Sequence, residues 1–177
     1  MPDTKIILSD EAIHRGLMRI AYEIAERNSD SNKVVVIGVQ TGGIHMAHRL
    51  AKQLESIWQH QIPVGHVDVG MHRDDLSKRP NPRLLPTKIP FDITGRTVIL
   101  VDDVLFSGRT TRAALDALND FGRAQAIQLA VLIDRGHREL PIKASYIGKN
   151  VPTSIQERIT VSWKEDGGED TVRLEKP

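Results

Sequence analysis

The stretch Val98-Ile-Leu-Val-Asp-Asp-Val-Leu-Phe-Ser-Gly-Arg-Thr-Thr111 decides the fold. It begins with an apolar run rich in β-branched residues, which predicts a buried strand over residues 97–101. Two carboxylates, Asp102 and Asp103, come at the end of this strand, and a turn of small residues then leads into a helix predicted over residues 110–121. Open α/β sheets bind their ligands at such a place, where a strand ends and a helix begins.

The turn after this strand carries the donors that a phosphate group needs. Ser107, Thr110 and Thr111 offer hydroxyl groups, and Arg109 lies among them. Gly108 lets the backbone bend so that several amide groups converge on an anion at the helix N-terminus. The aspartates do not suit a phosphate, so we expect them to accept hydrogen bonds from neutral donors such as ribose hydroxyls. Together these groups predict a site for a ribose 5-phosphate.

From these residues alone, two other interpretations of the acidic pair stay open. Such a pair after a buried strand can hold Mg²⁺, as in the receiver domains of response regulators, or it can simply cap the helix. Neither interpretation accounts for the whole run. The sequence contains neither GxxxxGK[ST] nor GxGxxG, so these two nucleotide-binding patterns are not predicted.

Helix and strand patterns alternate along the rest of the chain. Apolar residues recur every three or four positions from Ser9 to Asn28, which predicts an amphipathic helix with Ser9 as its N-cap. Further strands are predicted at 33–39, 64–69 and 127–133, a second helix at 44–54, and a late hairpin at 159–163 and 171–174. This order is typical of an α/β fold, with a parallel sheet covered by helices on both faces.

Composition bounds the class of protein. The 177 residues suit one domain, and 24 Lys+Arg against 23 Asp+Glu give a net charge of +1, so any polyanion site must be local. There is no cysteine, which excludes disulfides and thiolate metal sites. We find no signal peptide and no apolar stretch long enough to span a bilayer, and we expect a cytoplasmic protein without a membrane partner.

The run VILVDDVLFSGRT resembles the signature of type I phosphoribosyltransferases for 5-phosphoribosyl 1-pyrophosphate (PRPP). Residues 73–78 (RDDLSK), 134–141 (DRGHRELP) and 146–154 (YIGKNVPTS) are similar to stretches of the PyrR family, pyrimidine operon attenuation proteins with uracil phosphoribosyltransferase activity. The match extends over nearly the whole chain. It implies a single domain over residues 1–177, with a mainly parallel central sheet, a flexible lid at about 71–85, and a small hood formed by residues 134–154 and the hairpin 159–174.

The resemblance also implies the reaction and the residues that serve it. Uracil N1 attacks C1′ of PRPP, releasing pyrophosphate and forming UMP, with Mg²⁺ carried on the pyrophosphate and not bound directly by the protein. The implied site residues are Asp102, Asp103 and Arg73 for catalysis; Ser107, Gly108, Arg109, Thr110 and Thr111 for the 5′-phosphate; Gln40, Thr41, Gly42 and Gly43 for pyrophosphate; and Asp134, His137 and Arg138 for the base. Gly42 departs from the family pattern, which has Arg there, and His72 stands where we expect Tyr.

A second implied role is regulation. A protein of this family would sense UMP and UTP and bind an mRNA hairpin of a pyrimidine operon, here through Arg15, Arg19, Arg27 and Lys149. Met18 and Tyr22 stand where RNA-binding relatives carry Thr and His, which argues partly against RNA. The alternatives are a purine phosphoribosyltransferase or a nucleotide-binding regulator with little catalysis. We expect a homodimer or a larger homo-oligomer.

Overall fold

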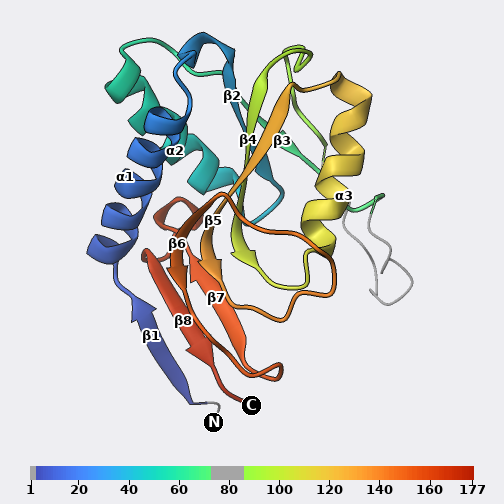
Figure 1. Ribbon diagram of the computed structural model, residues 1–177. Helices are drawn as coiled ribbons and strands as arrows, with labels where there is room; N and C mark the ends of the chain where they lie inside the picture. Colours follow the sequence, from blue (N-terminus) through green and yellow to red (C-terminus); the bar gives the residue numbers. More distant parts are fainter. Residues whose placement is uncertain (1–2, 73–85) are drawn as a thin grey trace.

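The computed structural model describes residues 3–72 and 86–177, which form two sheets and three long helices (Figure 1). The strands are β1 (Thr4–Leu8), β2 (Val34–Val39), β3 (Val64–Val67), β4 (Thr97–Leu105), β5 (Ala126–Asp134), β6 (Tyr146–Asn150), β7 (Arg158–Ser162) and β8 (Thr171–Glu175). The helices are α1 (Asp10–Arg27), α2 (Ile44–Trp58) and α3 (Arg109–Leu118), with short 3₁₀ turns η1 (Ser31–Lys33), η3 (Asn119–Phe121) and η4 (Lys164–Asp166).

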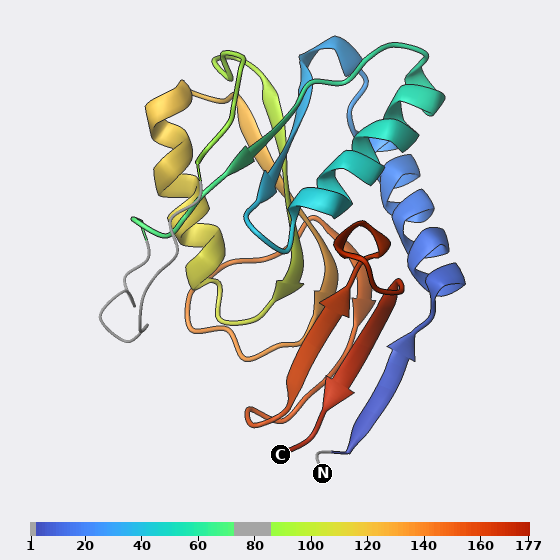
Figure 2. The same cartoon turned by 180° about the vertical axis from the view of Figure 1, so that it is seen from behind.

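The larger sheet is parallel and has the strand order β3-β2-β4-β5-β6. Helices α1 and α2 cover one face and α3 covers the other, as the two opposite views show (Figures 1 and 2). Strand β3 lies on one side of β2 and β4 lies on the other. The chain therefore reverses its direction of travel across the sheet between β2 and β4, and at such a switch point the loops after the two strands leave a crevice.

The sequence patterns for the core elements are confirmed. All six residues of β2 are buried, as expected for a strand with helices on both faces. Helix α1 buries one apolar stripe that includes Ile13, Leu17, Ile20 and Ile24. The side chain of Ser9 accepts a hydrogen bond from the backbone N–H of Ala12, 3.3 Å away, which makes it the N-cap.

The smaller sheet is antiparallel, with the order β1-β8-β7. The predicted hairpin is confirmed, since Ile159 of β7 faces Leu174 of β8. Strand β1, which the sequence did not predict, pairs with the other edge of β8 and brings the chain ends together (Figure 1). Its five residues are exposed or half-buried and include only a short apolar run, so the strand is fixed by pairing with β8 and by the packing of Ile7 and Leu8 against the core.

Three predictions need correction. Residues 146–150 were expected in the hood, but they form β6, the edge strand of the larger sheet. Strand β4 was expected to end at Val101, but pairing with β5 carries it on to Leu105, so both aspartates lie within the strand. Helix α2 runs to Trp58, four residues past its predicted end, before Gln59 in left-handed conformation caps it. Among the described residues, no helix is long and apolar enough to cross a membrane.

Candidate active site

The loop after β4 encloses a cavity of about 180 Å³, here called the Ser107 pocket. Its lining comes from one contiguous stretch: Asp102, Val104, Leu105, Phe106, Ser107, Gly108, Thr110 and Thr111. Gly108 has a φ of +92°, a left-handed conformation that favours glycine, and it directly precedes α3. The pocket therefore combines hydroxyl groups with the N-terminus of a helix, the combination that binds phosphate.

Neighbouring segments hold this loop in place. The carbonyl of Ser107 accepts hydrogen bonds from the backbone N–H groups of Glu139 and Leu140, at 2.9 and 3.2 Å. The guanidinium of Arg109 pairs with the carboxylate of Glu139, with Nε 2.7 Å from Oε2. Arg109 was predicted to bind the phosphate, but it does not line the Ser107 pocket. The other four residues predicted for the 5′-phosphate do line it.

The two aspartates belong to different pockets because successive side chains of a strand point to opposite faces. Asp102 lines the Ser107 pocket, and Asp103 lines a second cavity. The Oδ1 of Asp102 accepts from the N–H of Asp103 at 2.9 Å, and the Oδ1 of Asp103 accepts from the N–H of Val104 at 2.7 Å. Burial raises the pKa of Asp103, although its hydrogen bonds with Asp102 and Val104 partly offset this.

The second cavity, here called the His45 pocket, has a volume of about 330 Å³. It lies between the loop after β2, the end of β4 and the turn after β7. Its lining is Thr41, Gly42, Ile44, His45, Asp103, Val161, Trp163 and Asp166. The sequence predicted Thr41, Gly42 and Asp103 for this region. It did not predict His45, Trp163 or Asp166, because no motif or spacing links the 161–166 turn to the loop after β2.

The loop after β2 was predicted to bind pyrophosphate, and its four residues have separate surroundings. Thr41 and Gly42 line the His45 pocket. Gln40, joined to Thr41 by a cis peptide bond, donates from Nε2 to the carbonyl of Pro86 at 2.9 Å, and the N–H of Gly43 bonds to Val39. A Cβ at position 42 would collide with the carboxylate of Asp103. The Arg that the resemblance leads us to expect at this position would therefore require the Asp103 side chain to move.

The residues predicted to face the base bond to one another and to nearby backbone instead of lining either pocket. Arg138 pairs with Asp134 and donates to the carbonyls of Phe106 and Ile142, at 2.8 and 2.9 Å. The Nε2 of His137 lies 2.5 Å from the carbonyl oxygen of Thr153. Arg138 therefore ties the segment after β5 to the loop of the Ser107 pocket. Arg73 and almost all of the predicted lid lie outside the described residues.

Comparison with known proteins assigns the family. A family model for the phosphoribosyl transferase domain matches residues 3–166. Proteins named bifunctional protein PyrR are similar along almost their whole length. The one from Streptomyces coelicolor is 55% identical over 173 residues, which is 97% of this chain and 90% of the relative. The one from Bacillus subtilis is 50% identical over 177 residues, covering 98% of each. The chain belongs to the PyrR family.

The fold of this PyrR family member is shared with solved phosphoribosyltransferases. A hypoxanthine-guanine phosphoribosyltransferase from Bacillus anthracis is similar with a TM-score of 0.74 and 21% identity, over 97% of this chain and 98% of that one. A hypoxanthine phosphoribosyltransferase from Trypanosoma cruzi gives a TM-score of 0.74 and 19% identity, over 98% and 97%. These likenesses confirm the type I phosphoribosyltransferase fold. At such identities they carry no information on the base.

The cationic side chains predicted to bind RNA are not equally available in this PyrR family member. Arg19 donates to the carbonyls of Ile147 and Gly148 at 3.2 and 2.6 Å, and it also pairs with a glutamate one turn along α1. The guanidinium of Arg27 lies 5.9 Å from the centre of the Tyr146 ring. These two arginines fasten α1 to β6. A role in RNA binding remains a prediction for them.

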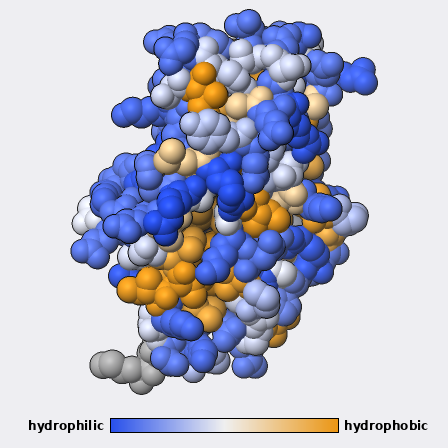
Figure 3. All heavy atoms as spheres, turned by 60° about the vertical axis from the view of Figure 1, so that its left-hand side comes forward, coloured by the Kyte–Doolittle hydropathy of each residue, from blue (hydrophilic) through white to orange (hydrophobic). Residues whose placement is uncertain are grey.

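The other two cationic side chains, those of Arg15 and Lys149, are more exposed to solvent. The side chain of Arg15 is 71% exposed, with a glutamate 3.8 Å away, and Lys149 is exposed on β6. Met18 and Tyr22 are exposed on the same helix as Arg15. The face in Figure 3, which brings the α1 side of the molecule forward, is mostly hydrophilic with apolar patches between. It is therefore a mixed surface.

Proposed function

We propose that the protein transfers the 5-phosphoribosyl group of PRPP to N1 of uracil, forming UMP and releasing pyrophosphate. One observation carries this proposal: two pockets open on the two sides of Asp102 and Asp103 at the switch point of a parallel sheet. One pocket offers hydroxyl groups and a helix N-terminus to the 5′-phosphate. The other meets the loop after β2, where the pyrophosphate would lie. The aspartates between them would hold the ribose.

Catalysis of this reaction depends mainly on how the protein positions the two substrates and stabilises the charges that develop. As the bond between C1′ and pyrophosphate breaks, the ribose gains positive charge and the leaving group gains negative charge. The carboxylate of Asp103 lies in surroundings that disfavour its charge, since burial raises its pKa. A positive centre developing beside it relieves this penalty, so the interaction is stronger in the transition state than before it.

Magnesium would enter with PRPP and would supply positive charge to the leaving pyrophosphate. Mg²⁺ prefers oxygen ligands and commonly uses one or two carboxylates together with substrate phosphates. Asp103 in the His45 pocket provides such an oxygen. Among residues 3–72 and 86–177 no three acidic or histidine side chains gather as a metal site.

Uracil is favoured over a purine base by the relatives. The proteins that are similar over the whole length at 50 to 57% identity are named PyrR, whereas the hypoxanthine enzymes are about 20% identical. The test is an assay with PRPP and Mg²⁺ and with uracil, hypoxanthine, guanine or orotate in parallel. We expect nucleotide and pyrophosphate only with uracil. Turnover with hypoxanthine or guanine would overturn the choice of base, and no turnover with any base would leave a nucleotide-binding regulator.

The relatives' designation as bifunctional supports a second role, which we propose as uridine-nucleotide-dependent binding to pyrimidine-operon mRNA. Arg15 and Lys149 are the exposed cations of the predicted RNA surface. A sensor works only if its effector binds better to the RNA-competent state than to the other state. UMP should therefore tighten binding to the protein's own leader transcript, and binding that UMP leaves unchanged would contradict the regulatory role.

A further inference from the structure

The His45 pocket is poor in positive charge for a site that would bind pyrophosphate. Residues 40–43 are Gln, Thr, Gly and Gly, none of which carries a charge. The described lining holds two carboxylates, those of Asp103 and Asp166, and a single basic side chain, that of His45. His45 lies in the first turn of α2, beside the loop after β2. It is thus the one described group in the lining that can become a cation.

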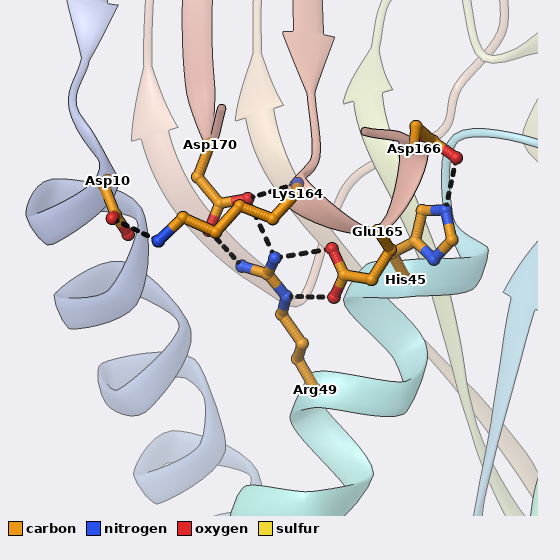
Figure 4. A network of polar contacts seen from close by, with 7 residues as sticks. All are labelled: Asp10, His45, Arg49, Lys164, Glu165, Asp166 and Asp170. Atoms are coloured by element: carbon orange, nitrogen blue, oxygen red, sulfur yellow. Dashed lines mark hydrogen bonds and ion pairs between the residues drawn. The ribbon is translucent and has the colours of Figure 1, made fainter. Parts of the chain in front are cut away.

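The nearest arginine along α2 is already fully engaged. The guanidinium of Arg49 donates to both carboxylate oxygens of Glu165 at 2.8 and 2.7 Å and to both of Asp170 at 2.8 Å each (Figure 4). It also stacks over Trp163, 4.7 Å from the ring centre. These hydrogen bonds raise the pKa of Arg49, so it stays charged and bound. Arg49 therefore serves as a latch that fixes η4 against α2.

The latch places Asp166 against His45. The Nε2 of His45 lies 2.9 Å from the Oδ1 of Asp166, and Figure 4 shows the carboxylate above the ring. The Asp166 side chain is 66% exposed and that of His45 is 27% exposed. An ion pair with one largely exposed partner contributes little, because water screens the two charges. Asp166 can therefore return to water with little loss when a stronger anion reaches the imidazole.

We propose that His45 is a pyrophosphate-binding residue that exchanges Asp166 for a phosphate oxygen when PRPP binds. The inference rests on the proposed function and names a residue for its pyrophosphate side. A protonated imidazole donates a charge-assisted hydrogen bond, the strong kind, and pyrophosphate carries more negative charge than one carboxylate. His45 then provides the positive charge that residues 40–43 lack.

The groups around His45 are mainly acidic. Asp103 faces it from β4, Asp166 and Glu165 face it from η4, and Arg49 lies one turn further along α2. Glu165 is already bound to Arg49, so Asp166 is the carboxylate that an incoming phosphate has to displace from His45.

Calorimetric titration of the full chain with magnesium pyrophosphate tests the proposal. We expect His45→Gln to weaken binding about three- to tenfold, because it removes a hydrogen bond from the imidazole to the phosphate. Asp166→Asn should tighten binding a few-fold, because it removes the competing carboxylate. His45→Arg should keep binding close to that of the wild type, because it keeps a cation at this position. Lys164→Gln is the control, since Lys164 shares the turn but pairs with Asp10 outside the pocket.

Three results would overturn the proposal: no pyrophosphate binding by the wild type, unchanged binding by His45→Gln, or weakened binding by Asp166→Asn. Thermal unfolding shows whether a variant has lost its fold. The uracil assay separates this inference from the proposed function. If the wild type makes UMP and His45→Gln binds pyrophosphate normally, the inference is wrong and the proposed function stands. If the wild type makes no UMP but binds pyrophosphate through His45, the proposed function is wrong and the inference stands.

Discussion

The Ser107 pocket and the His45 pocket share the aspartate pair of β4 but are built in different ways. The first is lined by eight residues of the single stretch 102–111 and offers mostly neutral donors. The second joins the loop after β2, the end of β4 and the turn after β7, and its lining includes two carboxylates and a histidine. The Arg49 latch holds the third part in place. The Ser107 pocket thus depends on local backbone geometry, and the His45 pocket depends on long-range ion pairs.

The largest expected effect is at the residue between the pockets. We expect Asp103→Asn to keep the fold and to lower kcat/KM for PRPP by on the order of 10- to 1000-fold, because it removes a charge placed to stabilise the positive ribose. Since burial raises the pKa of Asp103 and activity needs the carboxylate, wild-type activity should fall as pH falls through that pKa. Steady-state kinetics across pH measure both effects. Near wild-type kcat/KM in the variant would refute the assignment.

Gly108→Val should disable the Ser107 pocket alone. A Cβ there would lie 3.0 Å from Ile142 Cγ1, and the left-handed φ strains any β-branched residue. We expect about a hundredfold loss of ribose 5-phosphate binding by calorimetry, roughly the value of two charge-assisted hydrogen bonds. Gly95→Val is the matched control, because Gly95 also has positive φ, +72°, but has open space around it. Equal losses in both variants would mean that strain alone is responsible.

Asp170→Asn should loosen the latch of the His45 pocket. The Asp170 side chain is only 4% exposed and binds Arg49, so we expect a loss of about 2 kcal/mol in the free energy of unfolding. Arg49 lowers the pKa of Asp170. Its stabilisation is therefore complete above the unfolded pKa of about 4 and is lost as pH falls through the lower folded value. Denaturation at neutral and acid pH measures this loss.

The exposed pair of Asp3 and Lys176, 3.8 Å apart, gives the control for that experiment. Asp3→Asn should change the unfolding free energy by no more than about 0.5 kcal/mol. If Asp170→Asn is as mild as Asp3→Asn, the latch does not hold the turn, and the contrast between the two pockets is lost.

The smallest expected effect lies away from both pockets, on α1. We expect Arg15→Ala to weaken binding to the leader transcript about two- to fivefold and to leave UMP synthesis unchanged. Log affinity should fall with log salt at a slope of about −2 to −4 for three to five phosphate contacts. Arg19→Ala should also weaken RNA binding, but it removes the contacts with β6 as well. Salt-insensitive binding, or binding unchanged in both variants, would exclude this surface.

The two pockets also differ in how far sequence predicts them. The run 98–111 predicted the first part of β4, the turn, and four of the five phosphate-site residues as they line the Ser107 pocket, because a contiguous motif carries its own geometry. His45 and Asp166 are 121 residues apart, and no local pattern records their contact. Arg138 shows the converse, since its place in a resembling motif predicts base binding, which remains a prediction, but does not predict its three internal hydrogen-bond partners.

One edge strand of each sheet, β6 and β1, was not predicted from the sequence, for a related reason. Strands β2, β4 and β5 are buried over most of their length and show long apolar runs. Strands β1 and β6 are largely exposed or half-buried, and each lies at the edge of a sheet, so their sequences are only weakly constrained by burial. Pairing with a neighbour determines these strands, and the neighbour is distant in the sequence.

The most direct test is to titrate the two halves of PRPP separately into the variants of the two pockets. Ribose 5-phosphate should bind the wild type and His45→Gln equally and should lose affinity for Gly108→Val. Magnesium pyrophosphate should show the opposite pattern, and PRPP should bind both variants less well. The account is contradicted if either variant weakens both fragments to the same extent, because the two cavities beside the aspartates would then not divide PRPP between them.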